Sequence, residues 1–413
     1  MEPVLEHLAD RLIERQRAVY DVLNEGRLYD NVVNRVDGRR IRVGTKWLDD
    51  FASCNYLGLD LREEIIESVV PELRRWGTHP SWARMAASPE IYEELEEEIA
   101  SLLGVESTIV LPTISLIAVG LIPALAGKGG VILADRTVHK VNHDGCRLAR
   151  DMGAKLVSFR HDQLDGLESL LQEHQGAPSR LIVVDGILSV TGRCPDLAAM
   201  ATLARRYDAI LYIDDAHGFG VIGEDPTETT PYGRRGNGVV KHLGLSYENI
   251  IYVAGLSKAY SSLGAFVACP KALKSILKCN ITSYLVSGPI PTAALATALA
   301  GLRLNATEGD RWRARLHAQS TRIYSAYVES GVQTDNDNQF PILSAYVGSN
   351  ENVIQGGKAL FDRGVYVTLQ GYPLVPRGKG VLRATPTVAN TDEQVEHLID
   401  SVKQVTHSLG VRA

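Results

Sequence analysis

Between residues 107 and 268, short apolar runs alternate with segments of helical periodicity, and this alternation constrains the fold more than any other feature. The runs are rich in Val, Ile, Leu and Ala, as expected for strands that are buried on both faces of a sheet. Alternation at this spacing predicts an α/β fold with a mostly parallel sheet covered by helices. The predicted strands are residues 107–111, 131–134, 155–159, 181–185, 210–214, 250–254 and 265–268.

The segments around these runs supply the remaining predicted elements. The turn signal Asp37-Gly38 separates two short β-prone runs, 32–36 and 41–43, and predicts a hairpin. Helices are predicted at residues 5–23, 61–76, 89–103, 115–126, 141–151, 164–174, 196–207 and 289–305. The C-terminal part has an α+β pattern, with helices at 310–330 and 391–409 and strands near 340–346, 365–369 and 381–384.

A chain of 413 residues is too long for one small core, so we expect a large domain and a smaller one. The predicted division is an N-terminal helix and hairpin arm at 1–60, a large domain at 61–300 and a C-terminal α+β domain at 301–413. The net charge of −6 is mild, and no basic block indicates a nucleic acid partner. No cluster of His, Cys and Glu has the spacing of a metal site, so no metal is expected.

The first residues, Met1-Glu2-Pro3-Val4-Leu5-Glu6, lack the basic and apolar regions of a signal peptide. The longest apolar stretch, 114–126, is too short to span a bilayer. The five cysteines are scattered and form no CxxC, which is typical of a reduced, intracellular protein. We therefore predict a cytoplasmic protein whose cysteines are small core residues.

Two reactive side chains follow predicted strands. Asp214 ends the run 210–214, and Lys258 comes soon after the run 250–254. The carboxyl ends of parallel strands face the crevice where α/β proteins bind ligands. A lysine amine can hold pyridoxal 5'-phosphate as a Schiff base, and a carboxylate can keep the pyridine nitrogen protonated. Singly, the lysine would more often be a solvated residue and the aspartate a turn cap, but together they predict a pyridoxal-phosphate site.

Further polar residues lie after other predicted strands. His217 would reach the phenolic oxygen of the cofactor ring, His139 would stack on the ring, and Ser189 would bond to the ring oxygen. Each has an ordinary alternative as a loop histidine or a turn serine. Thr113 and Ser115 lie where a loop enters a helix, which suits a phosphate, and the alternative is an ordinary N-cap.

Two other features have clear alternatives. Arg383, on the last predicted strand, could hold a substrate carboxylate through its planar guanidinium, or it could be a surface residue. The stretch 218–223 matches GxGxxG. However, a dinucleotide fingerprint must open a helix, and residues 224–231 have no helical pattern. We therefore do not expect a nicotinamide site.

The order of these motifs resembles the α-oxoamine synthase family of fold-type I pyridoxal-phosphate enzymes. The likeness runs from about Asp49 to about His397. The segments that carry it are Asn55-Tyr56-Leu57-Gly58-Leu59 for N-Y-L-G-L, Asp135 with His139 for D-x-x-x-H, Asp214-Asp215-Ala216-His217-Gly218-Phe219-Gly220 for D-E-A-H-G-x-G, and Ser257-Lys258-Ala259 for the lysine motif. The resemblance implies a large domain with the parallel sheet and a smaller α+β domain.

The resemblance also implies a role for each matching residue. Lys258 would carry the Schiff base, Asp214 would pair with the ring nitrogen, and His217 would act with them in catalysis. Ser189 would bond to the ring oxygen and His139 would stack on the ring. The residues implied for the phosphate end are Thr113, Ile114, Ser115 and Ser257, and those implied for the substrate are Asn55, Arg383 and Arg84. A homodimer is implied, with a site that takes residues from both subunits.

Several segments depart from the family pattern. The usual Gly/Ser-rich loop is the bulkier stretch 77–88, the S-G-aromatic segment is Thr113-Ile114-Ser115, and H-A-S is His139-Lys140-Val141. Gly255 stands where the family usually has a phosphate-contacting Thr. We therefore expect a retained cofactor core with altered surroundings for the phosphate and the acyl donor. On this view, phosphate binding relies on the remaining hydroxyls, and Gly255→Thr should tighten it.

The predicted activity is that of a biosynthetic, pyridoxal-phosphate-dependent C-acyltransferase. It would condense a small α-amino acid with an acyl thioester, release carbon dioxide and form an α-amino ketone. The thioester carrier, coenzyme A or a carrier protein, is left open. One alternative is a decarboxylase, aldolase-type lyase or aminotransferase on the same scaffold, and another is a non-catalytic partner subunit, against which Lys258 argues.

Overall fold

The computed structural model describes residues 2–25 and 30–411 of the chain. These residues divide into two compact units. The first unit comprises Met1–Cys54, Val190–Arg193 and Arg315–Ala413, and the second comprises Asn55–Ser189 and Cys194–Ala314. One long helix, α11 (Thr292–Glu329), contributes to both. The predicted division into an arm at 1–60 and domains at 61–300 and 301–413 stays a prediction.

The second unit is built on a seven-stranded sheet with the order β4-β10-β9-β8-β7-β5-β6. All neighbours pair in parallel except β10, which is antiparallel to both β4 and β9. The strands are β4 (Ser107–Leu111), β5 (Val131–Asp135), β6 (Lys155–Phe159), β7 (Arg180–Asp185), β8 (Ile210–Asp214), β9 (Ile250–Gly255) and β10 (Ala265–Cys269). The predicted mostly parallel α/β sheet is confirmed, and the apolar runs are buried as expected.

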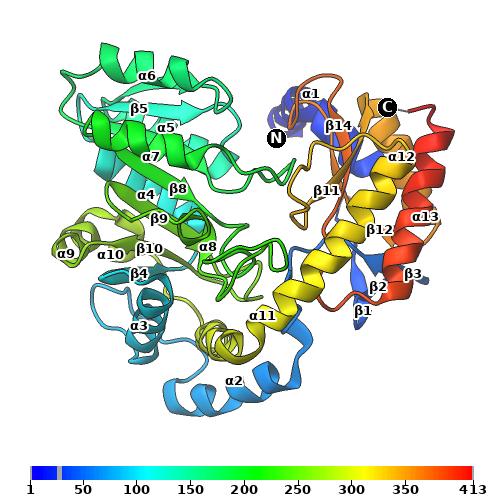
Figure 1. Ribbon diagram of the computed structural model, residues 1–413, viewed down its shortest axis with the longest axis horizontal. Coiled ribbons are helices and arrows are strands. Elements are labelled where there is room, and N and C mark those ends of the chain that lie inside the picture. The colour runs from blue at the N-terminus through cyan, green and yellow to red at the C-terminus, as the bar shows by residue number, and fades with distance from the viewer. Residues whose placement is uncertain (1, 26–29, 412–413) are drawn as a thin grey trace. The chain divides into compact units, whose positions relative to one another are not determined.

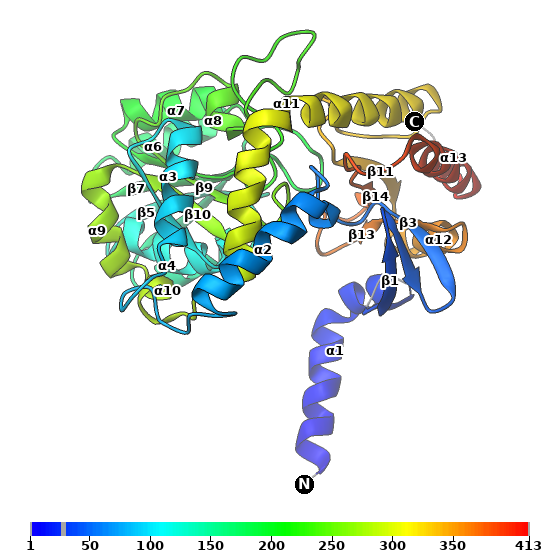
Figure 2. The same ribbon diagram turned by 90° about the horizontal axis from the view of Figure 1, so that it is seen from below.

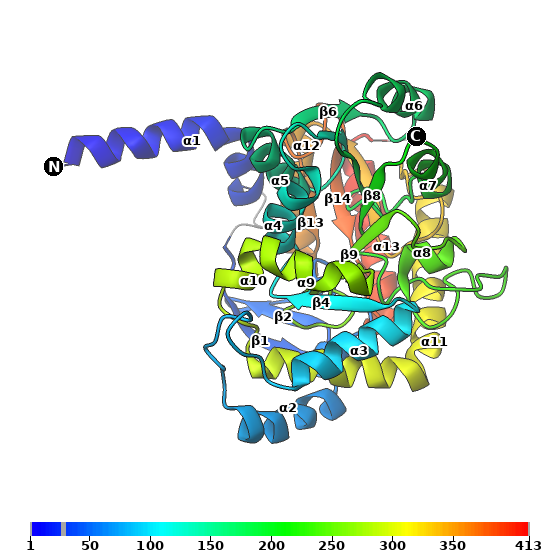
Figure 3. The same ribbon diagram turned by 90° about the vertical axis from the view of Figure 1, so that its left-hand side faces the viewer.

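Helices cover both faces of this sheet. Figures 1 and 3 show α4, α5 and α10 against one face and α6, α7 and α8 against the other. Ile, Leu, Val and Ala side chains of α4 and of the central strands form a continuous core between this helix and the sheet. The helices are α2 (Glu63–Trp76), α3 (Ile91–Leu103), α4 (Ile114–Ala126), α5 (Lys140–Asp151), α6 (Leu164–Glu173), α7 (Leu197–Arg206), α8 (Gly238–His242), α9 (Lys271–Asn280) and α10 (Thr282–Val286).

The first unit has two small sheets, with the orders β1-β2-β3-β12 and β11-β14-β13. The predicted N-terminal hairpin is confirmed, since β1 and β2 pair with Asp37 opposite Arg40, and Gly38 in the turn has a φ of 54°. The strands are β1 (Val33–Asp37), β2 (Arg40–Val43), β3 (Lys46–Asp50), β11 (Leu343–Gly348), β12 (Val365–Tyr366), β13 (Thr368–Gln370) and β14 (Gly380–Ala384). Three helices, α1 (Glu2–Glu25), α12 (Asn350–Asp362) and α13 (Asp392–Ser408), complete this unit (Figure 2).

The C-terminal half differs from the prediction in three ways. The helices predicted at 289–305 and 310–330 are the single helix α11. Gly309 lies inside this helix without breaking it. A Cβ atom at Gly309 would lie 2.2 Å from the Oδ1 atom of Asn305, which accepts a hydrogen bond from the buried Arg313. Glycine therefore leaves room for the Asn305 side chain. The strand predicted at 365–369 is divided between β12 and β13, which belong to different sheets. Helix α12 was not predicted.

The cysteines fit the prediction only in part. Cys146 and Cys269 are buried, Cys54 and Cys194 are half-buried, and Cys279 is exposed, so the expectation of a core position was wrong for Cys279. Across residues 2–25 and 30–411, no helix combines the length and apolar character that a bilayer crossing needs.

Candidate active site

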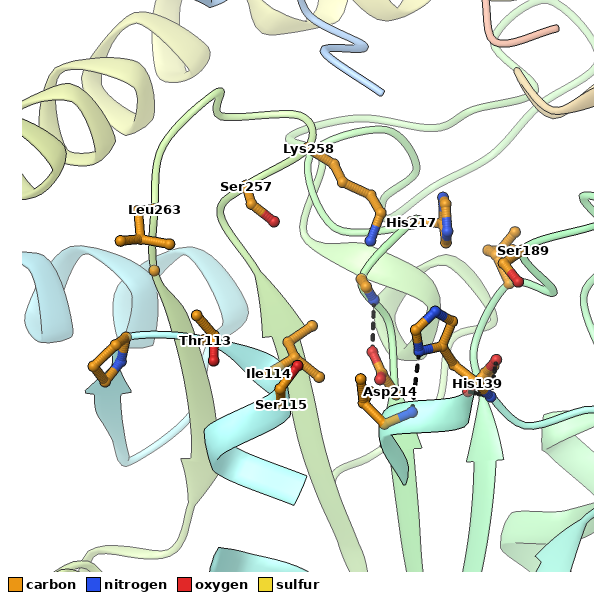
Figure 4. A pocket seen from close by; sticks show the side chains of 16 residues that line it. Thr113, Ile114, Ser115, His139, Ser189, Asp214, His217, Ser257, Lys258 and Leu263 are labelled. Atoms are coloured by element: carbon orange, nitrogen blue, oxygen red, sulfur yellow. Dashed lines mark hydrogen bonds between the residues drawn. The ribbon is translucent and has the colours of Figure 1, made fainter. Parts of the chain in front are cut away.

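A cavity of about 190 Å³ lies in the second unit, where β7, β8 and β9 end and α4 begins. It brings together all nine residues predicted to bind the cofactor: Thr113, Ile114, Ser115, His139, Ser189, Asp214, His217, Ser257 and Lys258. Figure 4 shows the side chains of Lys258, His217 and His139 pointing into the same space above the strand ends. Residues separated by more than a hundred positions in the sequence therefore share one pocket, and their individual roles stay predictions.

Lys258 lies in the loop that joins β9 to its antiparallel neighbour β10. The loop is closed by backbone hydrogen bonds: the Leu256 N–H donates to the Gly264 carbonyl at 2.8 Å, and the Ser262 N–H donates to the Leu256 carbonyl at 3.0 Å. The Ser261 N–H donates to the carbonyl of Lys258 itself at 3.0 Å. The lysine backbone is thus held by a short connection between two neighbouring strands.

Asp214 ends β8, and its carboxylate is almost fully buried. The Ala216 N–H donates to Oδ1 at 3.0 Å, and the side-chain amide of Asn142 donates to Oδ2 at 2.7 Å. Charge-assisted bonds of this kind hold a carboxylate in one orientation. The structure therefore presents a fixed carboxylate at the floor of the pocket.

A second buried carboxylate, Asp185, lies beside the first. It ends β7 opposite Asp214 in the sheet register, and it accepts the backbone N–H of His139 at 3.0 Å. Burial, with the nearby charge of Asp214, raises the pKa of Asp185 well above its usual range. This edge of the sheet therefore disfavours the charged form of Asp185.

Asn142 connects the two carboxylates and was not predicted as a site residue. Its amide nitrogen donates to Asp214 at 2.7 Å and to Asp185 at 3.4 Å, and the hydroxyl of Tyr212 donates to its amide oxygen at 3.4 Å. The side chain is fully buried. One signal in the sequence was available, because Asn142 is the polar member of the buried stripe of α5 that includes Cys146 and Ala149.

His217 is held by a second residue to which no role was assigned. The hydroxyl of Tyr56 lies 2.7 Å from Nδ1 of His217, and Tyr56 is fully buried. Tyr56 belongs to the N-Y-L-G-L-like segment, so its importance was visible as a motif but its partner was not. This contact fixes the orientation of the imidazole that lines the pocket.

Asp215 explains Gly218, the first glycine of the GxGxxG-like stretch. Its carboxylate accepts the N–H groups of Gly218 at 3.1 Å and Val239 at 2.8 Å, and the hydroxyl of Tyr252 at 2.7 Å. A side chain at Gly218 would lie 2.2 Å from the Asp215 carboxylate, so the glycine serves this contact. The next helix, α8, begins only at Gly238, which confirms that the stretch does not open a helix as a dinucleotide site requires.

The N-terminus of α4 forms one wall of the cavity. Thr113 is the N-cap, and its hydroxyl oxygen accepts the Leu116 N–H at 3.2 Å, so the capping interpretation is correct. The hydroxyl hydrogen of Thr113 is a separate donor. The first amides of a helix have no intrahelical partner and carry partial positive charge. With Ser115 and Ser257 alongside, this wall can bind an anion.

The residues predicted to bind substrate are not among those that line this cavity. Asn55 donates to the Asp60 carboxylate at 3.0 Å. Arg84 is buried in an ion pair with Glu96 at 2.9 Å, and it also donates to the Val110 carbonyl at 2.7 Å. Its guanidinium is thus engaged inside the second unit, which is the arrangement of a structural residue.

Arg383 belongs to the first unit. It lies on the central strand β14, opposite Ser344 of β11 and Thr368 of β13, and only 8% of it is exposed. Its guanidinium lies 3.9 Å from the sulfur of Cys54. The alternative of a solvated surface arginine is therefore wrong.

Comparison with known proteins identifies the family. Residues 49–402 match the family described as aminotransferase class I and II. The chain belongs to this family. Within it, an 8-amino-7-oxononanoate synthase from Geobacter sulfurreducens is 32% identical over 361 residues, which cover 87% of this chain and 89% of that protein. The corresponding synthase from Methylobacillus flagellatus is 32% identical over 399 residues, covering 96% and 95%.

Solved structures agree on the fold of this family member. A serine palmitoyltransferase from Sphingomonas wittichii has a TM-score of 0.88 at 24% identity and covers 98% of each chain. An 8-amino-7-oxononanoate synthase from Francisella tularensis has a TM-score of 0.74 at 23% identity and covers 88% of this chain and 99% of its own. Both kinds of enzyme are α-oxoamine synthases, so the predicted resemblance and the fold-type I architecture are confirmed.

Proposed function

We propose that this protein is an α-oxoamine synthase that uses pyridoxal 5'-phosphate to condense a small α-amino acid with an acyl thioester. Carbon dioxide is lost from the amino acid, the thiol leaves the acyl group, and the product is an α-amino ketone. One observation carries the proposal: the Lys258 amine, the Asp214 carboxylate and an anion-binding helix N-terminus line the same cavity. The 8-amino-7-oxononanoate synthases that are 32% identical support it.

The donor set of the cavity fits the cofactor. Thr113, Ser115 and Ser257 with the start of α4 suit a phosphate. The buried Asp214 carboxylate suits a protonated ring nitrogen, and the Lys258 amine suits an aldehyde. When bound, the cofactor supplies a conjugated ring that accepts the electron pair of a bond broken at the substrate α-carbon.

Proton transfer and orientation of the cofactor are then the roles of residues of the chain. Lys258 carries the amine that takes the proton from the α-carbon and returns one later as general acid. The Asp214 carboxylate would hold the ring nitrogen, in an orientation fixed by Asn142 and the Ala216 N–H. His217 would hold the ring oxygen, in an orientation fixed by Tyr56. His139 and Ser189 would also hold the ring, His139 through its imidazole and Ser189 through its hydroxyl.

The amino acid substrate needs a cationic group for its carboxylate, and we assign this role to Arg383. The burial of Arg383 supports a binding role over a solvated one. Arg383→Lys should weaken the binding free energy of the amino acid by about 2–3 kcal/mol and so raise its dissociation constant, since a lysine cannot form the planar, bidentate contact. Isothermal titration with the amino acid measures this, and an unchanged constant contradicts the assignment.

The assembly and the location of the enzyme follow the same reasoning. We propose a homodimer in the cytosol, with coenzyme A or a carrier protein as the thioester carrier. The exposed apolar side chains of Trp82 and Met85, with 52% and 65% of each residue accessible, support an interface near the loop 77–88. Sedimentation velocity of the purified protein tests the dimer.

The activity is tested by product analysis. Purified protein loaded with pyridoxal phosphate is incubated with each small amino acid, with and without an acyl thioester, and products are identified by mass spectrometry. We expect an α-amino ketone that requires both substrates and is lost in Lys258→Ala. Carbon dioxide or a keto acid formed without thioester would instead indicate a decarboxylase or an aminotransferase.

A further inference from the structure

Gly255, the last residue of β9, faces the side chain of Ile114, the first residue of α4. A Cβ atom placed on Gly255 would lie 3.1 Å from Cδ1 and 3.6 Å from Cγ1 of Ile114. It would lie 3.6 Å from the hydroxyl of Ser257. The backbone at Gly255 is not among the positions with positive φ, so the chain conformation itself accepts any L-residue here. The tightest contact at this position is the one with the isoleucine.

The direction of that Cβ atom matters because it points between two residues that line the cavity. Ile114 and Ser257 both belong to the wall that we assign to the phosphate. A side chain at position 255 would therefore enter the same corner. In this protein the space holds the terminal carbons of Ile114.

Ile114 is half-buried, and the apolar core lies against one side of it. It packs against the apolar core formed by α4 and the central strands, which includes Ile117, Val253 and Ala265. Interiors of this kind are close-packed, and an added group forces strain or a shift of the neighbour. A larger residue at 255 therefore requires Ile114 to move by a few tenths of an ångström against this core.

We propose that Ile114 and Gly255 act as a pair. The isoleucine fills the volume that a polar side chain at position 255 would need, so the phosphate is bound without a side-chain donor from that position. The inference rests on the proposed use of pyridoxal phosphate. It makes Ile114 the residue that sets the number of phosphate donors. The expectation that Gly255→Thr alone tightens binding is thereby reversed in sign.

A double-mutant cycle tests the pair. Four proteins are compared: the natural chain, Gly255→Thr, Ile114→Ala and the double variant. For each, the cofactor dissociation constant is measured by titration of its visible absorption band, and the melting temperature is measured on the apoprotein. We expect Gly255→Thr alone to weaken cofactor binding about tenfold or more and to lower the apoprotein melting temperature, since overpacking costs about 1–3 kcal/mol.

The double variant should behave in the opposite way. With Ile114 shortened, the threonine hydroxyl can reach the phosphate, and binding should tighten about 10-fold to 100-fold relative to Ile114→Ala, the factor expected for one hydrogen bond to a charged group. The gain should vanish when pyridoxal, which has no phosphate, replaces pyridoxal phosphate. Gly176→Thr is the matched control, because a side chain at Gly176 meets open space, and it should change neither quantity.

Two outcomes would overturn the inference. If Gly255→Thr alone tightens binding as much as the double variant, Ile114 does not occupy the corner. If the double variant binds no more tightly than Ile114→Ala, position 255 does not reach the phosphate. Gly255→Ser serves as a smaller change should the threonine variant fail to fold. Failure of the natural protein to bind pyridoxal phosphate would refute the proposed function, while the apoprotein melting temperatures would still test the packing.

Discussion

Replacing Asn142 by leucine removes the amide that joins the two buried carboxylates while keeping a side chain of similar size. Asp214 loses its shortest hydrogen bond, at 2.7 Å, and the longer contact to Asp185, at 3.4 Å, is lost with it. A hydrogen bond to a charged group contributes about 1.5–3 kcal/mol. The Tyr212 contact is long and adds little, and the buried leucine offsets part of the loss.

We therefore expect Asn142→Leu to lower the free energy of unfolding of the apoprotein by about 2–3 kcal/mol. Urea unfolding followed by circular dichroism measures this difference, and an unchanged slope with denaturant confirms that only stability has changed. A variant whose free energy of unfolding stays within about 0.5 kcal/mol of the natural protein, the range typical of surface substitutions, refutes the reasoning.

Asn142→Asp is the matched variant with nearly the same shape. It places a third carboxyl beside Asp185 and Asp214, so burial and like charges should raise its folded-state pKa above that of the unfolded chain. The folded variant then binds more protons than the unfolded one above about pH 4, and its stability must fall as the pH rises. The stability difference from the natural protein should thus be larger at pH 8 than at pH 5, and a flat difference contradicts the model of crowded carboxylates.

Three further predictions concern residues around the pocket. Tyr56→Phe should leave the fold intact and lower the free energy of unfolding by about 1 kcal/mol. It should also lower turnover and shift the pH–rate profile, because His217 loses the contact that orients it. An unchanged profile would show that Tyr56 only contributes packing. Burial raises the pKa of Asp215 to about 7, so its ionisation weakens the folded state as the pH rises from about 4 to 7. Relative to Asp215→Asn, the free energy of unfolding of the natural protein should therefore rise by up to about 4 kcal/mol when the pH is lowered from 8 to 4, as measured by urea unfolding. Arg84→Met should cost about 3–5 kcal/mol by leaving Glu96 with an incomplete set of partners, and Arg84→Met with Glu96→Gln should recover part of that loss in the same assay.

Local patterns were sufficient to predict the parallel sheet and the pocket at its edge. Apolar runs such as 210–214 and 250–254 are buried on both faces, and their polar ends must meet at one side of the sheet. The pattern could not show that α11 continues through Gly309. Glycine is needed there because the Asn305 and Arg313 side chains approach it closely, and that contact exists only in the folded helix.

The supporting contacts of the site were hidden for a similar reason. Asn142 lies three positions beyond His139 and has no motif of its own, so its link to Asp214 exists only once α5 is placed beside β8. Tyr56 and His217 are separated by 161 positions, and no local rule connects them. Arg84 was assigned to the substrate from a motif, whereas its burial against Glu96 depends on the packing of α3 and β4.

The antiparallel insertion of β10 has a consequence for how the reactive amine moves. Lys258 lies in the loop of a hairpin whose two strands, β9 and β10, pair with each other from the base of the loop onward. Such a loop has little freedom to translate, so the amine changes place through rotation about its own side-chain bonds while its Cα stays fixed. The amide hydrogens of Leu256 and Ser262, which close the loop, should accordingly exchange with solvent slowly and at rates that differ little between the cofactor-free and cofactor-loaded protein.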